Sequence, residues 1–94
     1  MPQPFLVHTS SRFLRDARKL RRQHPELVDV LEDLRAILGA DPYNRTKQYD
    51  IKKLTDVKPG EGQWRIRRGD YRLRYDIFGR DVVLYSFRHR REVY

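Results

Sequence analysis

The 94-residue sequence contains no cysteine. Disulfide bonds and thiolate metal sites are therefore excluded, and stability must come from side-chain packing, with or without help from a partner protein. The sequence also lacks an apolar run long enough to span a bilayer, and its N-terminus lacks the basic start and long apolar stretch of a signal peptide. These absences predict a cytoplasmic protein that has no membrane segment.

Acidic residues are the minority among the charges, with 13 Asp and Glu against 21 Lys and Arg. The net charge of +8 and the sequence pI of about 10.2 indicate a polyanionic partner, with nucleic acid ahead of an acidic protein or an anionic membrane. Residues 12–22 and the chain from residue 45 onward carry most of the basic side chains, whereas residues 26–41 are mainly acidic. This segregation of charge favours a directional binding face.

Hydrophobic residues make up 38% of the chain, but they recur with regular spacing, which indicates one small folded domain over residues 1–94. The spacing changes between strand and helix periods and predicts an α+β fold in the order β-α-α-β-β-β-β. We expect an N-terminal helical hairpin packed on one face of a mostly antiparallel, twisted sheet. The predicted strands cover residues 5–8, 47–54, both arms of a hairpin at 64–75, and 82–87, and the predicted helices cover residues 12–22 and 26–38.

Four arginines alternate with apolar residues on the two sides of a predicted turn at Gly69–Asp70. A two-residue turn places Arg67 opposite Arg72 and Arg65 opposite Arg74, all four on the sheet face away from the helices. Directly opposed like charges destabilise a sheet by about 0.2 to 1 kcal/mol per pair. We therefore predict that an anion binds this face; the alternative is a solvated face whose long side chains splay apart.

Short motifs follow one another at residues 50–54 (Asp-Ile-Lys-Lys-Leu), 64–67 (Trp-Arg-Ile-Arg), 69–75 (Gly-Asp-Tyr-Arg-Leu-Arg-Tyr) and 88–94 (Arg-His-Arg-Arg-Glu-Val-Tyr). In their order and spacing the chain resembles the RelE/ParE superfamily of bacterial toxins from toxin-antitoxin pairs, specifically the RelE branch of ribosome-dependent mRNA endonucleases. The resemblance implies that mRNA is cut in the ribosomal A site by attack of a ribose 2'-hydroxyl on the adjacent phosphate, without metal or cofactor. It also implies a RelB-like cognate antitoxin, the ribosome and mRNA as partners, and a toxin-antitoxin hetero-oligomer.

The resemblance assigns catalytic roles to residues by position. Arg65 and Arg67 match the basic pair on the third strand, Arg72 matches the arginine on the fourth strand, and Arg88 matches the arginine that opens the tail. Arginines suit this chemistry because they stabilise the extra negative charge of the phosphorane. Tyr94 matches the near-terminal tyrosine, which stacks on a base or orients the ribose; the alternative is a tail tyrosine that folds back onto the sheet.

This set lacks a group that accepts the proton of the 2'-hydroxyl, because a guanidinium stays charged at neutral pH. The best-known RelE members carry lysines where this chain has Arg65 and Arg67. His89 is the natural substitute, since an imidazole titrates near neutrality and this one lies among tail arginines. The alternative for His89 is a solvated tail side chain, and Lys52 and Lys53 are weaker candidates for the proton acceptor.

Further basic residues are expected to hold phosphates of the RNA backbone. Those on the first helix would contact ribosomal RNA, and a solvated helix face is the alternative. Two other functions stay open, namely ParE-like inhibition of DNA gyrase and a nucleic-acid-binding module without catalysis. The groove beside the leucine-rich helix and the arginine-bearing sheet face are both candidate docking surfaces for the antitoxin. The expected RNA-binding residues are Lys52, Lys53, Arg74, Arg90 and Arg91, together with Arg15, Arg18 and Arg22 on the first helix.

Overall fold

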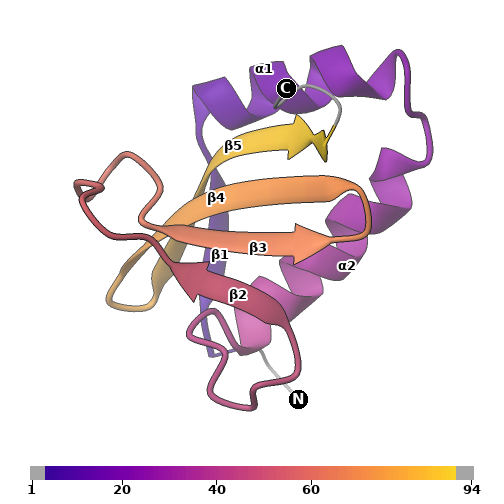
Figure 1. Cartoon of the computed structure of the whole chain (residues 1–94). Coiled ribbons are helices and arrows are strands. Elements are labelled where there is room, and N and C mark those ends of the chain that lie inside the picture. Colours follow the sequence, from indigo (N-terminus) through magenta and orange to yellow (C-terminus); the bar gives the residue numbers. More distant parts are fainter. Residues whose placement is uncertain (1–3, 91–94) are drawn as a thin grey trace.

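The computed structural model describes residues 4–90, and within them the chain follows the predicted order β-α-α-β-β-β-β (Figure 1). The α+β prediction is confirmed. The second strand is shorter than predicted, because residues 47–49 and Leu54 lie outside it. The elements are β1 (Leu6–Thr9), α1 (Ser11–Arg21), α2 (Leu27–Ala40), β2 (Asp50–Lys53), β3 (Trp64–Arg68), β4 (Tyr71–Phe78) and β5 (Asp81–His89).

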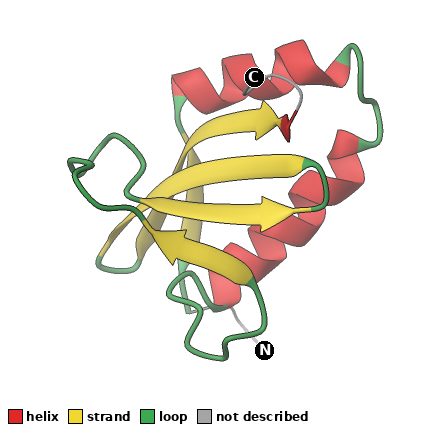
Figure 2. Ribbon diagram, in the orientation of Figure 1, coloured by secondary structure: helices red, strands yellow, loops and turns green. Residues whose placement is uncertain are grey.

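The strands form one sheet in the order β1-β5-β4-β3-β2, in which β1 runs parallel to β5 and the other neighbours are antiparallel. The nearly continuous apolar pattern of β5 predicts an interior strand, and this is confirmed, since β5 lies between β1 and β4. Both helices pack on one face of the sheet, as Figure 2 shows. The core contains Phe13 and Leu20 of α1, Leu27, Leu34, Ile37 and Leu38 of α2, and Ile66, Tyr71, Leu73, Tyr75, Val82, Leu84 and Phe87 of the sheet.

The ends of the two helices are defined by different features. The Ser10 hydroxyl accepts a hydrogen bond from the backbone N–H of Phe13 (3.0 Å) and caps α1. The predicted second helix ends at residue 38, and this is wrong by two residues, because α2 continues to Ala40. Gly39 is buried there, and its carbonyl accepts a hydrogen bond from Phe5 (3.1 Å). No helix within residues 4–90 is long and apolar enough to cross a membrane.

A loop from residue 54 to residue 63 is fixed to the sheet through its last residues. The buried carboxylate of Asp76 accepts hydrogen bonds from the backbone N–H groups of Gly62 (2.9 Å) and Gln63 (3.0 Å). The Arg74 Nε donates to the carbonyl of Gly62 (3.0 Å). Gly62 has φ +81°, and a Cβ there would lie 2.9 Å from the Cβ of Arg74, so this contact requires glycine. The loop therefore ends directly on the face that carries the arginines.

We expect Asp76→Asn to lower the free energy of unfolding by about 1 to 3 kcal/mol, because the N–H of Gly62 or of Gln63 loses its charged acceptor. Thermal or urea denaturation measures the change. The matched control is Asp56→Asn in the same loop, because Asp56 is exposed and asparagine tolerates its positive φ of 60°. Equal stability of the Asp76→Asn variant and the wild type would contradict the assignment of Asp76 as the anchor of this loop.

Candidate functional site

Basic side chains form rows across the sheet on the face opposite the helices. In the observed register Arg67 lies opposite Arg72, as predicted, and Arg72 in turn lies opposite Arg88 of β5. The next row joins Arg65 and Arg74, also as predicted. Alternation places these side chains on one face, because the residues between them are in the core. We call this surface, formed by Arg65, Arg67, Arg72, Arg74 and Arg88, the arginine face.

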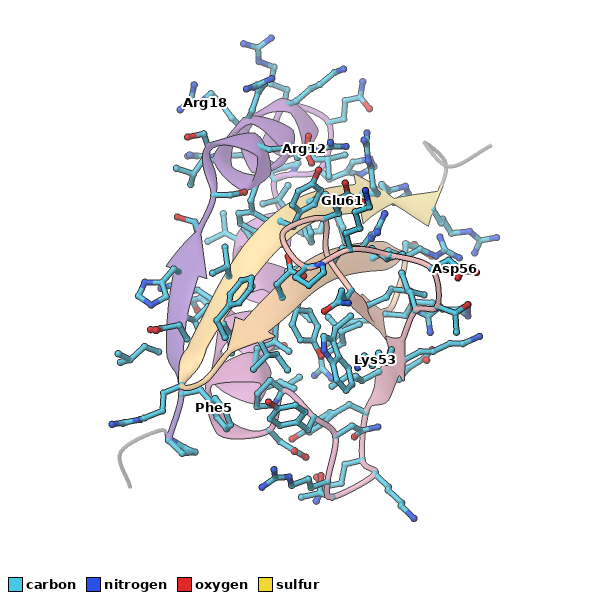
Figure 3. All side chains as sticks on the ribbon, turned by 90° about the vertical axis from the view of Figure 1, so that its left-hand side faces the viewer. Phe5, Arg12, Arg18, Lys53, Asp56 and Glu61 are labelled. Carbon is cyan, nitrogen blue, oxygen red and sulfur yellow. The ribbon has the colours of Figure 1, made fainter. Side chains whose placement is uncertain are left out.

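A cavity of about 290 Å³ opens in the arginine face. We call it the arginine pocket. Arg12, in the first turn of α1, is labelled in Figure 3 and also lines this pocket. The sequence places Arg12 in a basic helix but does not place that helix beside the hairpin. The residues that line the pocket are Arg12, Leu54, Arg65, Arg72, Arg74, Ser86 and Arg88.

Two guanidinium nitrogens in the pocket are buried and lack a protein acceptor. They are Nε of Arg65 and Nη1 of Arg72, and neither has a hydrogen-bond partner among the described residues. The Arg65 side chain is only 21% exposed. A buried donor without an acceptor costs about 1 to 3 kcal/mol, and more when the group is charged. An anion such as a phosphate offers acceptor oxygens of the kind these arginines lack, since guanidinium groups pair well with it.

Part of the charge repulsion on the arginine face is relieved within the chain. The Asp50 carboxylate of β2 contacts Nη2 of Arg65 (3.2 Å) and Nε of Arg67 (3.3 Å). Arg68, which is not part of the arginine face, is opposite Tyr71 and lies 3.6 Å from Asp33 of α2. Asp50 therefore balances part of the charge on this face, and the binding of an anion there stays a prediction. Asp50 was missed as a site residue because the sequence does not define the register of β2 against β3, which places Asp50 opposite Arg67.

His89 does not lie among the pocket arginines, and its predicted placement is wrong. It pairs with Tyr71 across β4 and β5, so it points to the helix side of the sheet, whereas its neighbour Arg88 points to the arginine face. Its side chain is buried, stacks on His24 with ring centres 4.1 Å apart, and meets the Tyr71 ring edge-on at 5.2 Å. The strand simply continues to His89, so alternation, and not tail flexibility, decides where the imidazole points.

The same cluster affects the Tyr71 phenol. Burial, together with the nearby Glu26 carboxylate, which accepts a hydrogen bond from the Tyr71 hydroxyl (3.3 Å), raises the pKa of Tyr71 to about 12. The phenol therefore stays protonated at neutral pH. His24 lies 3.5 Å from the same carboxylate. These contacts join the turn between the helices to the end of β5, which is a structural role on the side away from the arginine pocket.

Lys52 and Lys53, predicted as a pair, lie on opposite faces of β2. Lys52 is opposite Arg65 and shares the arginine face. Lys53 is opposite Trp64, and its ammonium nitrogen lies 5.8 Å from the centre of the indole ring. Only Lys52 of the two is therefore positioned beside the arginine pocket.

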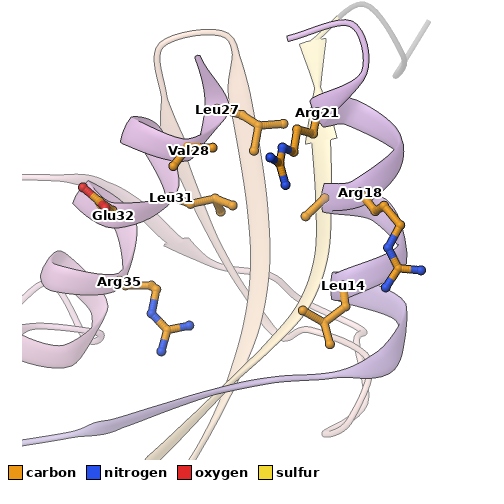
Figure 4. Close-up of a pocket in the computed structure, with 9 residues that line it drawn as sticks. Leu14, Arg18, Arg21, Leu27, Val28, Leu31, Glu32 and Arg35 are labelled. Carbon is orange, nitrogen blue, oxygen red and sulfur yellow. The ribbon is translucent and has the colours of Figure 1, made fainter. Parts of the chain in front are cut away.

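The predicted residues on α1 are exposed but lie away from the arginine pocket. Arg15, Arg18 and Arg22 are at the surface, and Arg18 lines a second cavity of about 350 Å³ between α1 and α2 (Figure 4). Five apolar side chains, three arginines and one glutamate line this cavity. We call it the helix groove; its lining residues are Leu14, Ala17, Arg18, Arg21, Leu27, Val28, Leu31, Glu32 and Arg35.

The remaining predicted residues belong to the C-terminal tail. Arg90 is placed beside the hairpin turn, where its N–H donates to the carbonyl of Asp70 (2.7 Å) and its guanidinium lies 3.4 Å from the Asp70 carboxylate. Arg91 and Tyr94 lie outside the described residues. Within residues 4–90, no three His, Asp or Glu side chains gather closely enough to hold a metal ion.

Residues 7–94 match the family model described as the ParE toxin of type II toxin-antitoxin system, parDE. A chain of the toxin-antitoxin complex RelBE2 from Mycobacterium tuberculosis is 27% identical, with a TM-score of 0.71 over 93% of this chain and 99% of that one. A chain of the archaeal RelE-RelB complex from Pyrococcus horikoshii OT3 is 20% identical, with a TM-score of 0.67 over 93% and 96% of the two chains. A comparison with curated protein sequences gives no significant match.

Proposed function

We propose a ribonuclease activity for this protein from the premise that the chain belongs to the RelE/ParE superfamily and is a toxin of a type II toxin-antitoxin system. In this superfamily RelE homologues are ribonucleases and ParE members are not. The proposal is a ribosome-dependent endoribonuclease that cuts mRNA in the A site and so inhibits translation in the cytoplasm.

The arginine pocket carries this proposal. Its two unpartnered guanidinium nitrogens, on Arg65 and Arg72, are donors held in place for an anion before that anion arrives. Preorganised donors of this kind stabilise charge that develops in a transition state, because they do not have to reorient during the reaction.

The proposed reaction is a transesterification, in which the phosphoryl group moves from the 5'-oxygen to the 2'-oxygen. The ribose 2'-oxygen forms a bond to phosphorus, the bond from phosphorus to the 5'-oxygen breaks, and the products are a 2',3'-cyclic phosphate and a 5'-hydroxyl. A base on the protein takes the 2'-hydroxyl proton, and the leaving 5'-oxygen takes up a proton from a general acid or from water. Arg65, Arg67 and Arg72 stabilise the phosphorane, and Arg88, which lines the same pocket, contacts the phosphate or the leaving oxygen.

We assign the role of proton acceptor to Asp50 in place of His89, because His89 points to the helix side of the sheet. Asp50 is half-exposed on the arginine face and contacts two of the arginines that would hold the phosphate. When the phosphate takes over Arg65 and Arg67, the ionised carboxylate is left next to it and free to accept a proton. Lys52 is the second candidate, because it projects from the same face of β2.

Other basic residues and the tail complete the proposal. Arg74, in the wall of the pocket, contacts the mRNA backbone, as do Lys52 and Arg90 beside it. Lys53, on the other face of β2, contacts RNA outside the pocket. In the tail, Arg91 contributes charge, and Tyr94 stacks on a base of the mRNA or orients its ribose. The exposed arginines of α1, namely Arg15, Arg18 and Arg22, contact ribosomal RNA phosphates.

A RelB-like antitoxin is the proposed inhibitory partner, in a toxin-antitoxin hetero-oligomer. Support comes from the similar structures, which are toxin-antitoxin complexes. The helix groove offers an apolar strip with Leu14 and Val28 about half exposed, which suits the apolar face of a partner helix. The arginine face is the second docking surface, because an acidic antitoxin segment would neutralise it.

The decisive experiment adds the purified toxin to a translation extract programmed with a defined mRNA. Primer extension then maps new 5' ends, which we expect at A-site codons and only when ribosomes are present. The family model names ParE toxins, so DNA gyrase inhibition is the second candidate. A supercoiling assay on the same preparation tests it: loss of gyrase activity together with intact mRNA would replace the ribonuclease proposal. Salt-sensitive RNA binding with neither effect would indicate a module without catalysis.

A further inference from the structure

A β-bulge turns one aromatic side chain of β5 toward the arginine face. The pairing of β4 with β5 slips by one residue and leaves Tyr85 as the extra residue. Leu84 and Phe87 are both fully buried in the core although they are three positions apart, so Tyr85 and Ser86 between them point to the other face. Ser86 lines the arginine pocket, and a Cβ built on Gly62, in the loop over that face, would lie 3.4 Å from the Cβ of Tyr85.

Arg12 lies against this tyrosine at the edge of the arginine pocket. Its Nη1 donates to the Tyr85 hydroxyl (3.2 Å), and its guanidinium carbon is 5.0 Å from the ring centre. The backbone around the bulge is fixed by α1, because the Ser10 hydroxyl donates to the Tyr85 carbonyl (3.2 Å) and the Phe87 N–H donates to the Asp16 carboxylate (3.1 Å). A guanidinium that lines the arginine pocket is thus held against an aromatic ring.

We propose that Tyr85 and Arg12 bind the nucleobase next to the phosphate that occupies the arginine pocket. The inference rests on the proposed function, since it takes nucleic acid as the ligand of that pocket. A base is joined to its phosphate through one ribose, so a subsite for it must lie at the margin of the phosphate site, where this pair is. Aromatic rings and guanidinium groups stack on every base, so the subsite recognises a base without selecting its identity.

The test compares the affinities of two probes for the isolated protein. One is a trinucleotide of 2'-O-methyluridine, which cannot react through its 2'-oxygen, and the other is a set of matched trinucleotides that lack one base each. We expect the wild type to bind the intact probe about 5- to 150-fold more tightly than one of the abasic probes. Tyr85→Leu should reduce this ratio to about one and leave the affinity for the abasic probe unchanged, whereas Tyr85→Phe should keep the ratio.

Two further variants provide a control and a test of the second residue of the pair. Tyr43→Leu is the matched control, because Arg45 lies over the Tyr43 ring at the same 5.0 Å but neither residue lines the arginine pocket. Arg12→Gln changes an exposed residue, should leave the fold intact, and should lower the ratio as well.

A wild-type ratio of one, or an equal loss of affinity for both probes in Tyr85→Leu, would overturn the inference. If the protein cuts mRNA but binds the intact and abasic probes equally well, the base subsite is refuted and the cleavage proposal stands. A protein that shows the ratio but cuts no mRNA retains the subsite and refutes only the cleavage proposal.

Discussion

Replacing Arg72 with alanine is expected to slow mRNA cleavage by about 100- to 1,000-fold, the usual cost of removing one preorganised donor from a transition state. Arg72 is the middle member of the row that runs from Arg67 to Arg88, and one of its nitrogens is buried in the pocket without a partner. The measurement is the single-turnover rate of A-site cleavage with the toxin in excess over ribosomes. Arg72→Lys should recover only part of the rate, because it restores the charge but not the planar fork.

The same substitution should not destabilise the fold. Arg72 faces an arginine on each neighbouring strand, so its removal relieves repulsion worth about 0.2 to 1 kcal/mol per pair. We expect an unchanged or higher melting temperature together with the loss of cleavage. Arg80→Ala is the control, because it also removes one arginine but at a position that does not line the arginine pocket. Arg80 lies at the turn between β4 and β5, where its guanidinium donates to the Pro4 carbonyl (3.2 Å). A slow and unstable Arg72→Ala protein would instead assign Arg72 a structural role.

The hairpin and its arginines could be predicted because local patterns determine them. Alternation fixes which face each residue takes, and the two-residue turn with Gly69 at φ +59° fixes the register, so Arg65 and Arg67 were predicted opposite their observed partners. The helix spacing and the interior position of β5 follow from equally local signals. These patterns recur within a few residues and therefore need no knowledge of the rest of the chain.

The errors concern contacts that link distant segments. His89 was treated as part of a tail, whereas β5 extends to it and alternation turns it toward His24, 65 positions earlier in the chain. Asp50 reaches Arg67 only through the pairing of β2 with β3 across a long loop. The bulge at Tyr85 depends on hydrogen bonds from α1, such as that of Asp16. Sequence spacing carries no information about such pairings, so the positions of these three residues could be found only from the structure.

Removing the Asp50 carboxylate is expected to change binding and cleavage in opposite directions. In the free protein Asp50 competes with phosphate for Arg65 and Arg67, so Asp50→Asn should bind RNA about two- to fivefold more tightly, the value of one exposed ion pair. If the carboxylate accepts the 2'-hydroxyl proton, the cleavage rate should fall by about 100- to 10,000-fold. Filter binding with non-cleavable RNA and single-turnover cleavage measure the two effects separately.

Tighter RNA binding together with slower cleavage distinguishes a proton acceptor from the other roles that Asp50 could have. If Asp50 has only a general electrostatic role, Asp50→Asn should bind RNA more tightly and cleave it at an unchanged or higher rate. If the substitution impairs folding, both RNA binding and cleavage should weaken. Asp33→Asn is the matched control, because Asp33 pairs with Arg68 of the same strand but lies outside the arginine pocket, and both quantities should stay at wild-type values. If Asp50→Asn cleaves normally and Lys52→Met does not, the proton acceptor is Lys52, and the carboxylate acts only as a counter-ion that the scissile phosphate displaces.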